Sequence, residues 1–242
     1  MSPARRASAE FTGTALLTAA VVGSGIAATQ LSPHDVGLQL LENAVATALA
    51  LGALILTFGP VSGAHFNPVV SAVDWWCARP TRTGLTLREL AAYVAAQISG
   101  AITGAILADV MFDRPAVAWS QTPRTGGNLW LAEIVATSGL VLLVFALARS
   151  GRTSAAPAAV GAYIGAAYWF TASTSFANPA VTIGRAFTHT FAGIAPASVP
   201  GFVVAQLVGA VVAVAGIRWW YPNIAPAADA VTVPRLPAEE LS

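Results

Sequence analysis

The sequence contains no lysine, a single cysteine and few charged residues of any kind. Its 242 residues include 12 basic residues, all of them arginine, and 11 acidic ones, so that charged residues make up 10% of the chain. Soluble domains contain roughly 25% charged residues, and a chain this poor in charge cannot cover a water-exposed surface. With 56% hydrophobic residues, the composition predicts a protein that crosses a membrane several times.

The same scarcities exclude several function classes. A formal net charge of +1 argues against a nucleic-acid partner. The lone Cys77 excludes an intrachain disulfide framework and a cysteine-based metal cluster. We find no metal-ligand cluster, no nucleophile paired with a base and no glycine-rich phosphate loop in the sequence. We therefore expect neither a cofactor nor catalytic activity.

Six apolar segments approach the roughly 20 residues that a helix needs to cross a ~30 Å hydrocarbon core. They lie at about 9–30, 36–58, 88–111, 128–149, 156–174 and 199–221. Two shorter helices are predicted at 67–77 and 178–188, and about ten helical residues rise only ~15 Å, which reaches the midplane without crossing. The polar or proline-rich segments 1–8 and 222–242 are predicted to be cytoplasmic tails of a channel domain at 9–221.

The two halves of the chain repeat each other. Three pairs of segments match in the same order: Ala9-Glu10 with Ala132-Glu133, Asn67-Pro68 with Asn178-Pro179, and Ala96-Gln97 with Ala205-Gln206. Each repeat, at about 9–111 and 128–221, holds three full spans, an odd number, so the second must insert upside down. We predict an all-α membrane protein in which an inverted repeat gives six transmembrane helices and two re-entrant half-helices.

The Asn-Pro pairs predict how a pore is built. Asparagine is a strong N-cap and proline suits the first helical position, so Asn67-Pro68 and Asn178-Pro179 each begin a half-helix. If these enter from opposite faces, their positive N-terminal ends converge near the membrane midplane. Each Asn carbonyl caps backbone N–H groups, which leaves the amide N–H groups free to orient a neutral hydroxyl or water in the lumen. The two half-dipoles would oppose cations and protons.

Two further patterns concern packing and orientation. Small residues recur every fourth position on matched spans, as close helix packing in membranes requires: Ala96, Gly100 and Gly104, and Ala205, Gly209 and Ala213. One side of the membrane receives most arginines: Arg5, Arg6, Arg79, Arg82, Arg88, Arg149, Arg152, Arg218 and Arg235. The other receives Arg114, Arg124 and Arg185, so that both termini are predicted to be cytoplasmic.

Three aspartates at span or half-helix ends are predicted to be solvated: Asp74, Asp109 and Asp113.

These motifs resemble the aquaporin (major intrinsic protein) superfamily over about residues 9–221. The resemblance rests on Gly63-Ala64-His65-Phe66-Asn67-Pro68-Val69, with Val69 where alanine is usual, on Phe176-Ala177-Asn178-Pro179-Ala180, and on the pair Glu10 and Glu133. It implies a bundle of six spans and two half-helices, usually a homotetramer with one pore per subunit, here in a bacterial inner membrane. It also implies that Glu10 and Glu133 bind the loop backbone that feeds each half-helix. His65 is expected either to line the cytoplasmic mouth or to pack within its loop.

The resemblance breaks at the pore constriction. Family members usually carry arginine three residues after the second asparagine, where this chain has Val181. Arg185 lies about one helical turn, ~6 Å, further along, where an ordinary surface or packing role and a reach back to the mouth are both open. Ungapped counting places the other three constriction positions at Thr47, Ala166 and Ser175. Four small, uncharged side chains predict a wide mouth.

A wide mouth without arginine favours a bulky neutral solute that makes few hydrogen bonds. A bacterial branch associated with arsenic-resistance clusters looks similar here, so arsenous acid or a small organoarsenical is the leading cargo. Glycerol facilitators usually have aspartate at the position of Thr182, yet Pro196-Ala197 is similar to their Pro-Leu, so a general water and glycerol channel stays open. A secondary transporter, which also uses broken helices, is the alternative from another class.

Overall fold

The computed structural model describes residues 1–79 and 84–221, and these form one bundle of helices without any β-strand. The predicted tail at 222–242 lies outside the described residues. The α-helices are α1 (Pro3–Leu31), α2 (Val36–Ser62), α3 (Pro68–Ala78), α4 (Leu87–Met111), α5 (Gly127–Arg149), α6 (Ala156–Phe170), α7 (Pro179–Gly184) and α8 (Val199–Trp220). Short 3₁₀ turns are η1 (Thr153–Ala155), η2 (Arg185–Phe187) and η3 (Pro196–Ser198).

Most predicted spans are confirmed, with changes at their ends. Within the described part of the chain, α1, α2, α4, α5 and α8 with η3 are long and apolar enough to cross a membrane. Helix α1 begins at Pro3, because Ser2 Oγ accepts the Arg5 N–H, so most of the predicted tail 1–8 is helical. Helix α6 stops at Phe170, short of the predicted 174, because Thr171 is already extended. Its 15 residues rise only ~22 Å.

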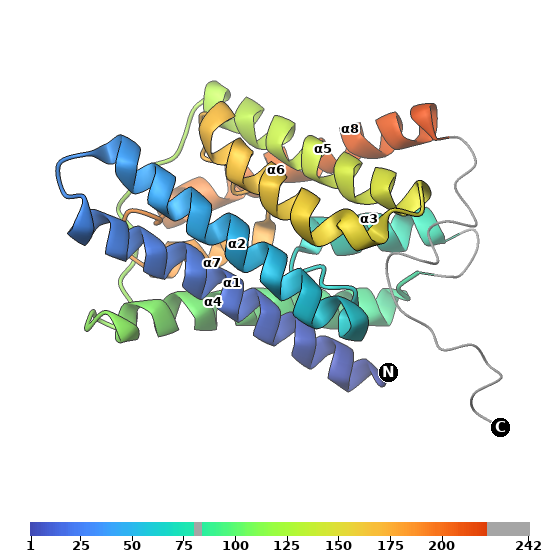
Figure 1. Ribbon diagram of the computed structural model, residues 1–242, viewed down its shortest axis with the longest axis horizontal. Coiled ribbons are helices and arrows are strands. Elements are labelled where there is room, and N and C mark those ends of the chain that lie inside the picture. Colours follow the sequence, from blue (N-terminus) through green and yellow to red (C-terminus); the bar gives the residue numbers. More distant parts are fainter. Residues whose placement is uncertain (80–83, 222–242) are drawn as a thin grey trace.

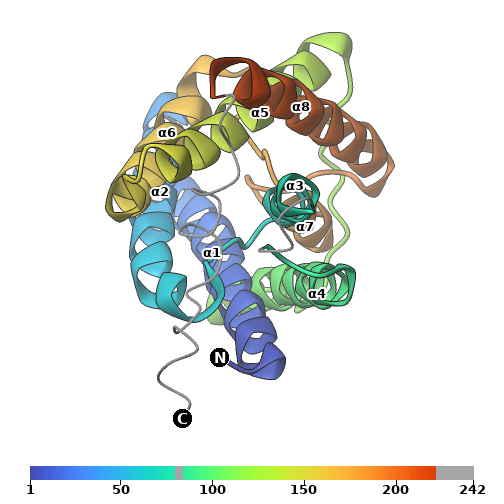
Figure 2. The same cartoon turned by 90° about the vertical axis from the view of Figure 1, so that its right-hand side faces the viewer.

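The two repeats pack in the same way. Helix α1 packs against α2 and α4, and α5 packs against α6 and α8. Figure 1 shows the half-helices α3 and α7 in opposite halves of the bundle. Figure 2, which looks along the bundle, shows them one behind the other inside the ring of longer helices. This is the arrangement that an inverted repeat predicts for two half-helices that enter from opposite sides.

The small-residue stripes lie where the long helices approach most closely. A Cβ atom at Gly104 would overlap the carbonyl oxygen of Ala15 on α1, and one at Gly100 would overlap that of Phe11. In the second repeat, a Cβ at Gly209 would lie 2.7 Å from the carbonyl oxygen of Ile134 on α5. The predicted close approach of helices at these stripes is thus confirmed, and the partners are α1 for α4 and α5 for α8.

We expect Gly104→Ala to destabilise the protein by about 2 kcal/mol, because the new methyl group must push α4 away from the α1 backbone. Gly127→Ala is the matched control, since a Cβ there meets nothing within 4 Å. Thermal unfolding in detergent, followed by tryptophan fluorescence, measures both variants. Equal melting temperatures for the two variants would contradict the steric argument.

Two of the three aspartates that were predicted to be solvated are buried instead. Asp74 and Asp109 are each 1% exposed, whereas Asp113 is exposed as predicted. Asp74 Oδ2 accepts the Leu85 N–H at 3.0 Å, and Asp109 Oδ1 accepts the Thr188 hydroxyl at 2.9 Å. Their carboxylates therefore tie chain segments that follow the half-helices to the bundle, a long-range role that position near a helix end does not reveal.

Candidate pore and its constriction

Both Asn-Pro pairs begin half-helices, as predicted. Asn67 Oδ1 accepts the Val69 N–H at 3.0 Å, at the start of α3. Asn178 Oδ1 accepts the N–H groups of Ala180 and Val181 at 3.0 and 3.2 Å, at the start of α7. Proline follows each cap at the first helical position, where a missing N–H costs nothing.

The two caps also bind each other's loops. The Asn67 amide nitrogen donates to the carbonyl oxygen of Ala177, and the Asn178 amide nitrogen donates to that of Phe66, both at 2.7 Å. These crossed bonds hold the N-termini of α3 and α7 together at the centre of the bundle. Each amide therefore keeps one of its two N–H donors for the lumen.

Glu10 holds the segment that leads into α3. This carboxylate is completely buried on α1 and accepts four hydrogen bonds. Its Oε1 accepts the Ser62 hydroxyl at 2.6 Å and the His65 N–H at 3.0 Å. Its Oε2 accepts the Phe66 N–H at 2.7 Å and the Gln97 side-chain amide at 2.8 Å. The role implied by the family resemblance matches this geometry.

Glu133 has the same function in the second repeat. It is also completely buried, and its oxygens accept the N–H groups of Phe176 at 2.9 Å and Ala177 at 2.8 Å. The amide of Gln206 donates to Glu133 at 2.6 Å, as Gln97 does to Glu10. The three matched pairs of the sequence repeat therefore form two equivalent networks.

The backbone held by these carboxylates is strained. Several non-glycine residues in the two segments have φ values of about +50° to +60°: Ala64, Phe66, Thr174, Ser175 and Ala177. Such residues cost on the order of 1–3 kcal/mol each and persist only where the surroundings fix them. The glutamates supply that fixation through buried acceptors aimed at the N–H groups of this backbone.

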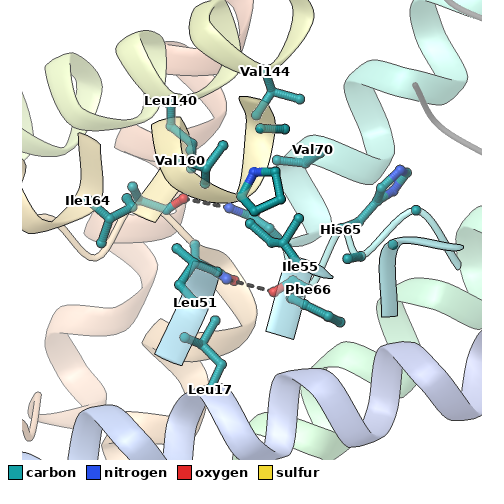
Figure 3. A pocket seen from close by; sticks show the side chains of 18 of the residues that line it. Leu17, Leu51, Ile55, His65, Phe66, Val70, Leu140, Val144, Val160 and Ile164 are labelled. Atoms are coloured by element: carbon teal, nitrogen blue, oxygen red, sulfur yellow. Dashed lines mark hydrogen bonds between the residues drawn. The ribbon is translucent and has the colours of Figure 1, made fainter. Parts of the chain in front are cut away.

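A cavity of about 550 Å³ passes the paired asparagines. Both Asn67 and Asn178 line it. Its walls are mainly apolar side chains from α1, α2, α5 and α6, and Figure 3 shows Leu17, Leu51, Leu140, Val160 and Ile164 around it. At one end it reaches Gly59 and Thr153, and at the other it reaches Val181 and Arg185. Mostly apolar walls with a few fixed polar groups suit a small, uncharged solute.

Three of the four predicted constriction residues line this cavity: Thr47, Ser175 and Val181. The Thr47 hydroxyl lies 3.2 Å from the hydroxyl of Tyr168, and either can donate. The Ser175 hydroxyl is buried and has no hydrogen-bond partner among the described residues. Val181, 5% exposed, presents an apolar wall where the family usually has arginine.

Ala166, the fourth predicted constriction residue, is exposed and does not line the cavity. The cavity face of α6 carries Val160, Ile164 and Tyr168, which follow one another at four-residue spacing. Ala166 lies two positions from Ile164, about 200° around the helix axis, and so faces the opposite way. The prediction at this position is wrong, and the mouth contains a tyrosine where counting placed an alanine.

Arg185 belongs to the same mouth. It is only 3% exposed and lines the cavity beyond Val181, so it is not a surface residue. Its guanidinium carbon lies 3.5 Å from the centre of the Phe176 ring, and its Nε donates to the carbonyl oxygen of Ala192. The bulk and the positive charge that the sequence analysis found missing are thus present one helical turn further along.

His65 lines the other half of the cavity. Its Nδ1 lies 2.9 Å from Ser71 Oγ, and its ring packs edge-on against Tyr93 at 5.5 Å between centres. Its Nε2 is buried without a partner in the described part of the chain. His65 therefore lines the cavity and also packs against neighbouring side chains, while its place at a cytoplasmic mouth stays a prediction.

Comparisons with known proteins agree with this geometry. The family profile described as Major intrinsic protein matches residues 1–177. The chain is 54% identical to Aquaglyceroporin AqpS of Rhizobium meliloti, over 89% of each chain. It is 29% identical to the Glycerol uptake facilitator protein of Pseudomonas aeruginosa, over 92% of this chain and 90% of that one. An X-ray structure of the aquaglyceroporin from Plasmodium falciparum superposes with a TM-score of 0.68 at 21% identity, covering 95% of this chain and all of that one, which shows a shared fold.

Proposed function

Because this chain belongs to the major intrinsic protein family, we propose that it conducts small neutral solutes with several hydroxyl groups, arsenous acid or a small organoarsenical above all. Family membership makes the chain a multi-pass membrane channel and not an enzyme. Its similarity to an aquaglyceroporin and a glycerol uptake facilitator supports a channel for solutes of the water and glycerol type.

Val181 carries the proposal for the cargo. It gives the mouth an apolar side where the family usually places a guanidinium. A solute that makes few hydrogen bonds can therefore pass this position without having to bind a charged donor there. The Ser175 hydroxyl and the Thr47–Tyr168 pair line the same cavity and offer hydroxyl groups to a solute. Arsenous acid and glycerol both carry three hydroxyl groups, so the same mouth suits either, and a general water and glycerol channel is the second candidate.

The alternative of a secondary transporter needs free carboxylates that bind and release coupling ions. Glu10 accepts four hydrogen bonds and Glu133 accepts three, and four of these seven come from backbone N–H groups of the segments that lead into the half-helices. A proton or ion at either carboxylate would break the support of a half-helix. The contacts therefore favour a channel without ion coupling.

The proposal extends to the surroundings of the pore. We place the channel domain at about 9–221 in a bacterial inner membrane, in contact with lipid, with four copies per assembly and both termini in the cytoplasm. Helices α3, α5 and α8 end on the same side of the bundle as the N-terminus, whereas α4 ends and α5 begins on the opposite side (Figure 1). Arg79, Arg149 and Arg218 lie in or directly after the last turns of α3, α5 and α8, and Arg114 and Arg124 lie in the segment between α4 and α5. This distribution supports the orientation.

Stopped-flow swelling of proteoliposomes tests the function. We expect the purified chain to raise glycerol and arsenous acid permeability at least roughly tenfold over protein-free vesicles, since a preformed pore removes the cost of entering hydrocarbon. The flux should rise linearly with the solute gradient and be indifferent to a proton gradient. Water flux without glycerol or arsenous acid flux would contradict the proposal. Arsenous acid flux well above glycerol flux would favour the metalloid over the general channel.

A further inference from the structure

We propose that Arg185 supplies the fixed positive charge and the hydrogen-bond donors of the pore mouth, one turn beyond the position that Val181 leaves apolar, and so determines which solutes pass. This inference rests on the proposed function, because it assigns selectivity within the same pore. Arg185 lies four residues after Val181, which occupies the position where the family usually has arginine.

The backbone places Arg185 on the lumen side. Residues four apart lie on one face of a helix, so Arg185 continues the stripe that begins with Val181. Helix α7 ends at Gly184, and Arg185 opens the 3₁₀ turn η2. A Cβ at Gly184 would lie 2.6 Å from the carbonyl oxygen of Ala101, so α7 rests directly on α4 at this point. This contact fixes the direction in which the Arg185 side chain leaves the backbone.

Contacts along the side chain keep it in the mouth. Its Nε donates to the carbonyl oxygen of Ala192, and its guanidinium stacks on the Phe176 ring. Phe176 is in turn held edge-on by Phe202, at 5.1 Å between ring centres. The Arg185 carbonyl oxygen also accepts the Ile194 N–H at 3.3 Å. With both ends of the residue anchored, the guanidinium is preorganised at the cavity wall.

The two Nη groups of the Arg185 guanidinium are available to bind a solute. Across the described ranges 1–79 and 84–221, the Nη groups of Arg185 have no hydrogen-bond partner, and no carboxylate lies within ion-pair distance of them. A cation without an ion-pair partner in a mainly apolar mouth repels other cations, because little water screens it. Its N–H groups also form strong, directional bonds to the hydroxyl oxygens of a neutral solute.

The repeat shows that this arginine is not a shared packing residue. The matching position in the first repeat, 111 residues earlier as for the two asparagines, is Asp74. Asp74 bonds the Leu85 N–H and does not line the cavity. The two half-helices have equivalent asparagine caps and equivalent supporting glutamates. They differ at the position of Asp74 and Arg185, where only the second repeat presents a charged side chain to the cavity.

Arg124 offers a matched control within the chain. Its guanidinium also lies on the Phe176 ring, at 5.1 Å from the centre, and its Nε donates to the Gly193 carbonyl oxygen at 2.9 Å. Its Nη2 donates to the carbonyl oxygen of Phe191 at 3.4 Å. Arg124 therefore makes the same kinds of contact as Arg185, but it does not line the cavity.

The test measures sodium leak and solute swelling on the same proteoliposomes, for the native chain and for Arg185→Leu, Arg185→Gln, Arg185→Lys and Arg124→Leu. We expect sodium permeability to rise roughly 10- to 100-fold in Arg185→Leu and Arg185→Gln, because the charge removed lies at the wall of a mainly apolar cavity, where the effective dielectric is low. Arg185→Lys keeps the charge and should stay within about threefold of the native chain, as should Arg124→Leu.

The outcomes separate this inference from the proposed function. Sodium-tight Arg185→Leu and Arg185→Gln pores that still pass glycerol would overturn the role of Arg185 and leave the channel proposal standing. A leak in Arg185→Lys as large as in Arg185→Leu would assign Arg185 a structural role and overturn it too. Should Arg185→Leu not assemble, Arg185→Gln decides, since it keeps a hydrogen-bonding side chain of similar length. A native chain that passes no neutral solute would instead refute the proposed function.

Discussion

Replacing Glu10 with leucine is expected to lower the free energy of unfolding by on the order of 4 kcal/mol and to abolish solute flux. Leucine leaves four buried donors without an acceptor: the Ser62 hydroxyl, the N–H groups of His65 and Phe66, and the Gln97 amide. A buried unsatisfied donor costs about 1–3 kcal/mol, and the strained backbone that leads into α3 loses its support as well. Thermal unfolding in detergent should show a fall of about 10 °C in the melting temperature.

Glu10→Gln is the matched control, because it keeps the size of the side chain and one carbonyl oxygen. That oxygen can still accept the Ser62 hydroxyl and the His65 N–H. The Gln97 amide can turn over and present its Oε1, which has no partner among the described residues, to the new amide group. The Phe66 N–H and the turned Gln97 NH2 group, which gives up its 2.9 Å bond to Ser71 Oγ, then lack acceptors, so we expect a smaller loss than in the leucine variant, which leaves four donors unpaired. Equal losses in the two variants, or a stable and conducting leucine variant, would contradict the assigned role.

The half-helices and their supports could be predicted from the sequence because their chemistry is local or repeated. Asn67 and Asn178 cap the helices that follow them through atoms two or three residues away. Glu10 and Glu133 are long-range contacts, yet the internal repeat pairs them in the sequence, and a charge within an apolar span requires a partner. The crossed bonds between the two caps join residues more than 100 positions apart, and nothing local indicates them.

The constriction was harder to predict, because it depends on where α6 lies and how it is rotated. Counting from a family pattern placed Ala166 in the mouth, whereas the helix turns Tyr168 toward Thr47. The spacing of Val160, Ile164 and Tyr168 was a usable signal, since it marks a helix face of larger side chains. Arg185 could be placed only once α7 was seen to end at Gly184, close against α4.

Because the capping asparagines bond each other's loops at the midplane, the mouth contributes more of the pore's selectivity than the midplane does. Each capping asparagine has given one N–H to the opposite loop, so the midplane offers a passing solute fewer donors than two free amides would. The mouth combines an unpartnered Ser175 hydroxyl, the apolar Val181 and the charged Arg185. A solute must therefore exchange water for this mixed set of contacts at the mouth, and size is only one part of the barrier.

The second large effect is expected from Val181→Arg, which restores the usual family residue. Val181 is 5% exposed and lines the cavity, so an arginine there must extend into the space that solutes use. It also brings a second guanidinium to about one helical turn, ~6 Å, from Arg185. We expect glycerol and arsenous acid permeability to fall at least roughly tenfold, and water permeability less than about threefold, because a narrowed pore rejects the larger solutes first. Stopped-flow swelling with each solute measures the ratio.

Val181→Leu tests a small increase in size without any charge. Leucine adds one methylene to the same wall and no charge, so it should reduce arsenous acid and glycerol permeability by a smaller factor and leave sodium permeability unchanged. If Val181→Arg lowers water, glycerol and arsenous acid permeability equally, the mouth at Val181 does not select by size. If it lowers none of them, the added side chain is not in the path, and the path must avoid the wall that Val181 shares with Ser175 and Arg185. A selective loss in Val181→Arg with little change in Val181→Leu would show that the long, charged side chain, and not one added methylene, sets the selectivity.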